Sequence, residues 1–212
     1  PAEVLALYEV DTGGDFPPIP DKPQDSQYGG MLGADNAVPS FLLWGDSHAD
    51  SASPGVDVTA RKLGKRGYFL GRNSCAPSYI DVEIAKDACN ASNRAIVQWL
   101  KKHPEIKTVL LVGRWSAYDV SYSKKYPHGG AESPTLLRDT LGTLIEGLQK
   151  DGKRIVFMMD PPHAPVFTLP LYVARAKYYN TPLDLKYDLS RYAEQEAGLN
   201  AALADLKKRY EF

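Results

Sequence analysis

The sequence predicts an α/β fold with a doubly wound parallel sheet. Four short apolar segments alternate with helical segments along the chain. These apolar segments are continuous instead of alternating with polar residues, which is typical of parallel strands buried on both faces. The length of 212 residues suits one domain with a substantial core. In such folds the functional residues collect at the carboxyl ends of the strands.

Each element follows from a local pattern. The expected strands are SFLLWG (40–45), RGYFLG (66–71), KTVLLVG (107–113) and RIVFMM (154–159). The expected helices cover residues 49–66, 90–105, 133–153 and 188–212. The first of these helices contains Pro54 and Gly55, which should break or delay it. Proline at the start and glycine at the end support the helix at 133–153.

The first 37 residues are rich in Gly, Pro and Asp and show no sustained period. We therefore expect a linker or extended arm at 1–37 and the α/β domain at 38–212. The 25 basic and 26 acidic residues give a net charge of −1. This balance does not suggest an electrostatic partner such as nucleic acid or an anionic membrane surface.

The two cysteines, Cys75 and Cys89, lie among polar and turn-forming residues. Buried free cysteines usually lie in apolar surroundings, so a disulfide is the better interpretation. A disulfide favours an oxidising compartment, whereas the alternative is two unpaired thiols in a cytosolic protein. A zinc site is disfavoured, because no CxxC pair or histidine cluster accompanies the cysteines.

The segment VPSFLLWGDSHADS (38–51) places Ser47 directly after the first expected strand. Gly45 permits a tight turn there, and the backbone N–H groups of a following helix would stabilise an oxyanion. A serine after Gly-Asp is more often a helix cap than a nucleophile, so position at a strand end is what favours catalysis.

FLLWGDSHA resembles the first block of the SGNH (GDSL-type) hydrolase superfamily, in which this serine is the nucleophile. With SCAP and VLLVGRWSAY downstream, the chain is similar to periplasmic SGNH domains fused to membrane acyltransferases of the acyltransferase-three family. Those proteins O-acetylate bacterial surface polysaccharides. The resemblance covers Val38 to Tyr178 and implies a flavodoxin-like fold. It also implies the periplasmic domain of a bacterial inner-membrane protein, with an N-terminal membrane acyltransferase domain in the same protein.

The resemblance implies a role for several residues. Ser47 would be the nucleophile and its N–H the first oxyanion donor. The second donor would be Gly71, with Asn73 as a weaker candidate. The third block, Gly-x-Asn in the superfamily, reads Gly-Arg-Trp here, so Arg114 and Trp115 stand at the substrate site. The indole N–H of Trp115 would replace the amide; the alternative is an aromatic plug with a stacked arginine.

A serine nucleophile needs a base within hydrogen-bond reach. Side chains at adjacent helical positions diverge, which makes His48 a poor base for Ser47. His163, in DPPH, has the Asp-x-x-His spacing of the superfamily but follows the fourth strand instead of the last. We therefore expect a sheet lacking its last strand, with the catalytic Asp and His beyond Phe212; His163 remains the alternative base.

The resemblance implies O-acetyl transfer to a polysaccharide of the O-antigen or lipopolysaccharide type, with no metal or other cofactor. Two alternatives stay open: an SGNH esterase or deacetylase that uses water, and a non-catalytic accessory or glycan-binding domain. Aromatic residues near the expected strand ends are candidates for stacking on sugar rings. They are Trp44, Trp115, Tyr118, Tyr122 and Tyr126.

Overall fold

The computed structural model describes residues 14–78, 88–115, 135–159, 161, 169–183 and 189–212. The chain divides into two compact units. The first is Pro1–Thr12 with Pro161–Gln195, and the second is Gly13–Asp160 with Glu196–Phe212. The first unit contains helix α6 (Leu169–Tyr178) and the beginning of helix α7 (Leu189–Leu206). The rest of α7 belongs to the second unit, which also holds the sheet. The four helices predicted from the sequence did not include α6, and that part of the prediction was wrong.

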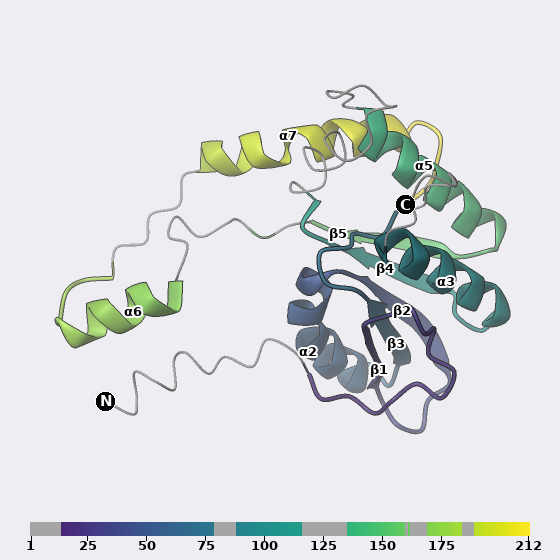
Figure 1. The fold of residues 1–212 in the computed structure, drawn as a ribbon, viewed down its shortest axis with the longest axis horizontal. Coiled ribbons are helices and arrows are strands. Elements are labelled where there is room, and N and C mark those ends of the chain that lie inside the picture. Colours follow the sequence, from purple (N-terminus) through teal and green to yellow (C-terminus); the bar gives the residue numbers. More distant parts are fainter. Residues whose placement is uncertain (1–13, 79–87, 116–134, 160, 162–168, 184–188) are drawn as a thin grey trace. The chain divides into compact units, whose positions relative to one another are not determined.

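The second unit is built on a five-stranded sheet in the order β1-β3-β2-β4-β5 (Figure 1). The strands are β1 (Tyr28–Gly33), β2 (Pro39–Gly45), β3 (Arg66–Gly71), β4 (Thr108–Val112) and β5 (Arg154–Met158). Strands β3, β2, β4 and β5 are parallel, which confirms the predicted α/β fold. Their carboxyl ends therefore share one rim of the sheet.

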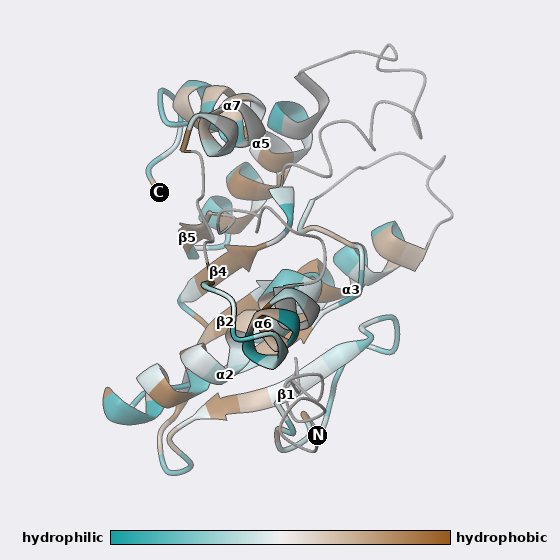
Figure 2. Cartoon of the chain, turned by 90° about the vertical axis from the view of Figure 1, so that its left-hand side faces the viewer, coloured by the Kyte–Doolittle hydropathy of each residue, from teal (hydrophilic) through white to brown (hydrophobic). Residues whose placement is uncertain are grey.

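Strand β1 lies in the segment that we expected to be a linker or arm. It pairs antiparallel with β3, and Ile19, upstream of it, is buried. The packed body therefore begins before residue 37. The prediction missed β1 because YGGMLG, with three glycines, lacks the continuous apolar pattern of the other strands. Figure 2 shows the same contrast: β1 is pale over much of its length and brown only towards its arrowhead, whereas β2 and β4 are mostly hydrophobic brown.

Helices cover both faces of this sheet. Helix α2 (Ser47–Lys62) packs against β1, β3 and β2 on one face. On the other face, α3 (Ala88–Lys102), α5 (Thr135–Lys150) and the end of α7 enclose the larger core. Alternate residues of a strand serve opposite faces: Leu42 and Trp44 enter the larger core, and Phe41 and Leu43 the smaller one beneath α2.

Helix α2 runs without interruption through Pro54, although we expected a break there. A proline has no N–H, so the carbonyl of Asp50 loses its usual helical donor. The hydroxyl of Ser53, which is buried, donates to that carbonyl at 2.6 Å and replaces the missing bond. This local substitution explains why the helix continues.

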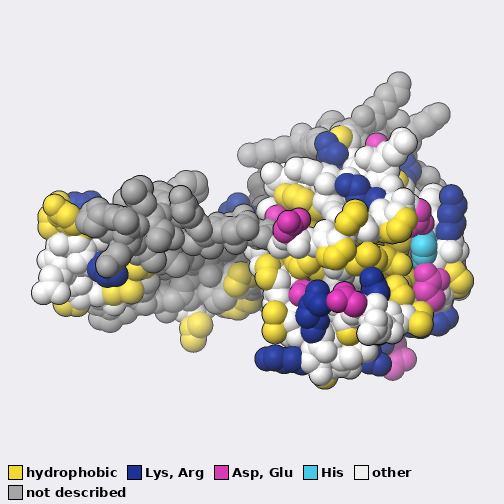
Figure 3. All heavy atoms as spheres, turned by 90° about the horizontal axis from the view of Figure 1, so that it is seen from below, with side chains coloured by type: hydrophobic (Ala, Val, Ile, Leu, Met, Phe, Trp, Pro, Cys, Tyr) yellow, Lys and Arg dark blue, Asp and Glu magenta, His cyan; other side chains and the backbone are white. Residues whose placement is uncertain are grey.

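No helix in the described part of the chain is long and apolar enough to cross a membrane. Basic and acidic side chains are interspersed on the face seen in Figure 3, with hydrophobic side chains grouped between them. The near-neutral net charge of the chain is thus reflected in a mixed surface on this face.

Candidate active site

The site begins where β2 ends, at Gly45. A Cβ at this position would overlap the carbonyl oxygen of Val112 in β4 and press on the side chain of Ala49. Glycine is therefore required by the close approach of β2, β4 and the first turn of α2. This packing fixes where the chain leaves the sheet, and Ser47 follows two residues later as the first residue of α2.

Asp46, between Gly45 and Ser47, is the N-cap of α2. Its Oδ1 accepts the backbone N–H of His48 at 2.8 Å, and its Oδ2 accepts the backbone N–H of Arg114 at 2.9 Å. Its side chain is almost completely buried. Asp46 thus joins the carboxyl ends of β2 and β4. The alternative in which Ser47 is itself the helix cap is wrong, because Asp46 performs that function.

Ser47 is half-buried at the rim, in the first turn of α2. The N–H groups of a first helical turn have no partner within the helix, and the helix dipole places partial positive charge there. An oxyanion formed beside the Ser47 hydroxyl would be stabilised by these N–H groups and this partial positive charge. The arrangement therefore suits nucleophilic attack on a carbonyl.

The loop after β3 differs from what we expected of Gly71. The N–H of Gly71 donates to the hydroxyl of Ser26 at 3.1 Å, in a buried position. The same hydroxyl donates to the carbonyl of Tyr28 at 2.6 Å. A Cβ on Gly71 would overlap the carbonyl oxygen of Gly45, so glycine here serves strand packing. The Gly71 N–H is thus already bound to a side chain of the segment that precedes β1.

The next residues of this loop are tied to the same N-terminal segment. The backbone N–H of Asn73 donates to Oε1 of Gln27 at 3.1 Å, and the guanidinium of Arg72 donates to the carbonyl of Asp25 at 3.3 Å. The side chain of Asn73 remains exposed. Sequence reasoning missed Asp25, Ser26 and Gln27 as supports of the site. Their partners lie about 45 residues away, and no local motif signals such contacts.

The predicted disulfide is present. Cys75 and Cys89 are bonded, with their Cα atoms 5.3 Å apart, and they join the loop after β3 to the first turn of α3. Beside it, the amide of Asn93 donates to the carbonyl of Ala76 at 2.9 Å. The loop that borders the rim is therefore held from two sides: by residues 25–28 and by α3.

Trp115 lies at the end of β4 but points into the core. It is fully buried, and its indole N–H donates to the carbonyl of Met158 at 2.9 Å. Its ring packs against Phe157, with centroids 5.0 Å apart. The indole N–H is thus not available to an oxyanion. Trp44 is fully buried as well, so neither tryptophan side chain is exposed for stacking on a sugar. The other aromatic candidates, Tyr118, Tyr122 and Tyr126, lie outside the described residues.

Arg114 has the opposite orientation to its neighbour. Its side chain is exposed, while its backbone is held by Asp46.

Tyr28 opposes Gly71 in the β1–β3 pair, near the same rim. Burial raises the pKa of the Tyr28 hydroxyl, and the negative charges of Asp50 and Asp46 raise it further. The hydroxyl of Tyr28 therefore stays protonated at neutral pH and remains a hydrogen-bond donor.

Histidines do not complete a triad within the described residues. His48 is the second residue of α2, and its backbone N–H is bound to Asp46. His103 lies at the end of α3, between the carboxylates of Asp21 and Glu105. His128 and His163 lie outside the described residues. No group of three or more metal-ligating side chains occurs among the residues whose positions are described.

The family model of the SGNH domain fused to AT3 domains matches residues 15–211. The chain therefore belongs to this family of SGNH domains. It is also similar in structure to the periplasmic domain of a lipopolysaccharide acetyltransferase from Salmonella ser. Paratyphi A, with a TM-score of 0.53 and 15% sequence identity. The match covers 81% of this chain and 65% of the solved chain, just under two thirds of its length. A search of curated proteins gave no match.

Proposed function

We propose that this chain is the periplasmic domain of a membrane acyltransferase and moves an acetyl group through Ser47 onto a hydroxyl of a bacterial surface polysaccharide. The observation that carries the proposal is the cap of α2. Because Asp46 accepts the N–H of His48, the Ser47 hydroxyl is not needed for capping at the carboxyl end of a central strand. Family membership and the fold shared with a lipopolysaccharide acetyltransferase domain support acetyl transfer as the reaction.

The reaction has two steps. In the first, the Ser47 oxygen attacks the acetyl carbonyl, its proton passes to a base, and the donor's leaving group departs with a proton. In the second, a sugar hydroxyl attacks acetyl-Ser47, and the serine regains its proton. The backbone N–H of Ser47 and the helix dipole stabilise the oxyanion in both steps. With water as acceptor, the same site would be an esterase.

The structure changes which residues we assign beside Ser47. The Gly71 N–H and the Trp115 indole have other acceptors, so we assign the second oxyanion donor to the exposed side-chain amide of Asn73. Arg114, exposed at the end of the adjacent strand β4, is proposed to bind an anionic or hydroxyl group of the glycan. For the base we propose a histidine of an Asp-x-x-His motif, either His163 or one in a chain that continues past Phe212.

Intact mass after incubation with p-nitrophenyl acetate tests the nucleophile. We expect one acetyl adduct on the wild-type chain and none on Ser47→Ala. Ser51→Ala, which removes an exposed serine of the same helix, should label normally. Labelling of Ser47→Ala at the wild-type rate would refute the assignment of Ser47.

The base and the acceptor need two further measurements. The labelling rate of His163→Ala, compared with that of wild type and of a chain extended past Phe212, identifies the histidine that acts as base. Incubation of the labelled protein with O-antigen then shows where the acetyl group goes. Transfer to the glycan supports an acetyltransferase, whereas release as acetate alone supports an esterase.

A further inference from the structure

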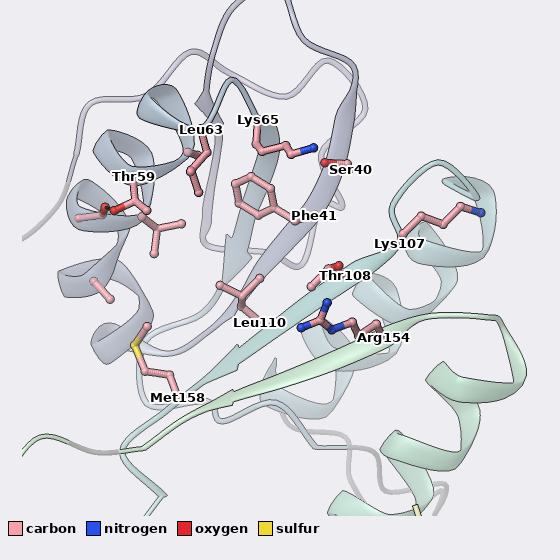
Figure 4. A pocket seen from close by; sticks show the side chains of 14 residues that line it. Ser40, Phe41, Thr59, Leu63, Lys65, Lys107, Thr108, Leu110, Arg154 and Met158 are labelled. Carbon is pink, nitrogen blue, oxygen red and sulfur yellow. Dashed lines mark hydrogen bonds between the residues drawn. The ribbon is translucent and has the colours of Figure 1, made fainter. Parts of the chain in front are cut away.

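A second feature lies on the sheet face beside α2. A cavity of about 770 Å³ is bordered by α2 on one side and by β2, β4 and β5 beneath it (Figure 4). Its apolar lining includes Phe41, Val56, Leu63, Leu110 and Met158. Helix α2 packs mainly against β1, β2 and β3 and only slightly against β4, and the cavity lies beside it on the side of β4 and β5.

Three cations stand along one end of this cavity. Lys65 directly precedes β3, Lys107 directly precedes β4, and Arg154 begins β5. In this parallel sheet they all lie at the amino ends of the strands, and Ser40 of β2 lies between them (Figure 4). No Asp or Glu is among the described residues that line the cavity. The side chains of all three cations are exposed.

Apolar side chains stand in the open beside these cations. Leu63, just after the end of α2, is 68% exposed and lines the cavity. Val38, directly before β2 at the same end of the sheet, is 75% exposed. Exposed apolar residues next to exposed cations are typical of surfaces that meet a lipid interface. The near-zero net charge of the whole chain concealed this local group of cations.

We propose that the cationic end of this face, defined by Val38, Leu63, Lys65, Lys107 and Arg154, docks on the surface of an anionic phospholipid membrane. The cations bind lipid phosphates, and the exposed apolar side chains enter the interface. A second copy of the chain is a poor occupant, because the same face would oppose cations to cations. The proposal does not rest on the reaction proposed for Ser47.

Docking in this way has a consequence for orientation. Ser47 lies at the carboxyl end of β2, whereas the cations lie at the amino ends of its neighbours. Six steps of about 3.3 Å along β2 separate the two rims by about 20 Å. A membrane bound at the cationic end would leave the Ser47 rim facing away from the lipid, open to a soluble or extended glycan.

Vesicle flotation tests the proposal on the 212-residue chain. Vesicles of phosphatidylcholine with one quarter phosphatidylglycerol should carry the protein, and pure phosphatidylcholine should not. The double reversal Lys107→Glu/Arg154→Glu should lower the partition coefficient at least tenfold, since each cation near an anionic surface contributes about 1 kcal/mol, close to a fivefold change. Leu63→Ser should also weaken binding, and Ser47→Ala should bind like wild type.

A matched control makes the same change in charge on another element. Lys101→Glu/Lys102→Glu, at the exposed end of α3, should bind like wild type. The proposal is overturned if wild type does not float with anionic vesicles, or if both double reversals lose equal affinity. It is also overturned if 10 mM inorganic phosphate binds this face but vesicles do not. A dimer in sedimentation velocity that Lys107→Glu/Arg154→Glu disrupts would likewise overturn it in favour of a second copy.

Discussion

Replacing Asp46 tests how the rim around Ser47 is held. Asp46 is buried and accepts two backbone N–H groups, one from His48 at the start of α2 and one from Arg114 at the end of β4. Asp46→Ala removes both acceptors. Asp46→Asn keeps one carbonyl oxygen, which suffices for the cap, but directs an NH₂ group at the second N–H.

The expected losses follow from these two bonds. The cap contributes about 1 kcal/mol to the free energy of unfolding. A bond from a backbone N–H to a buried carboxylate contributes about 1.5–3 kcal/mol. Asp46→Ala should therefore lose about 3 kcal/mol in all, and Asp46→Asn about 2 kcal/mol. For a chain of this size, 3 kcal/mol corresponds to a decrease in Tm of about 6–12 °C.

Urea unfolding at neutral pH measures both values. Asp35→Asn serves as the control, because this carboxylate is 74% exposed and should change the free energy of unfolding by less than about 0.5 kcal/mol. Acetylation of Ser47 should slow in both Asp46 variants, since the helix start is no longer tied to β4. If Asp46→Asn unfolds at the same urea concentration as wild type, the bond to Arg114 contributes nothing, and the reasoning is refuted.

Three further predictions concern the stability of the elements around Ser47. Gly45→Ala should destabilise the protein by about 3 kcal/mol or more in urea unfolding, because its Cβ meets the Val112 carbonyl; a loss below about 1 kcal/mol would contradict this. Asp57, in α2, accepts hydrogen bonds from the guanidinium of Arg61 and the backbone N–H of Gly33. Burial alone would raise the pKa of Asp57, but these hydrogen bonds outweigh it and lower the pKa. The stability that Asp57 contributes is therefore present above about pH 4 and lost as the pH falls through its folded pKa, so the difference from Asp57→Asn should shrink between pH 6 and pH 3; a constant difference would contradict this. Cys75→Ser/Cys89→Ser should lower the free energy of unfolding by about 3 kcal/mol, with thiol titration as the check that wild type is oxidised.

The sequence predicted the elements whose pattern is local. Continuous apolar segments predicted β2, β3, β4 and β5, and the helical segments that follow them predicted α2, α3, α5 and α7. The prediction failed for β1, where three glycines conceal a strand that exists through its pairing with β3. It also failed at Pro54, since it did not foresee the hydroxyl of Ser53 as a replacement donor.

The sequence by itself determined that Ser47 follows a buried strand and that two cysteines in polar surroundings form a disulfide. Only the tertiary structure decided that Asp46 is the cap, that Ser26 occupies the N–H of Gly71, and that three cations meet at the opposite end of the sheet. Periodicity and composition describe a residue's neighbours along the chain. Hydrogen-bond partners 45 and 68 positions away become neighbours only when the strands take their order in the sheet, and that order decides which backbone groups remain free for chemistry.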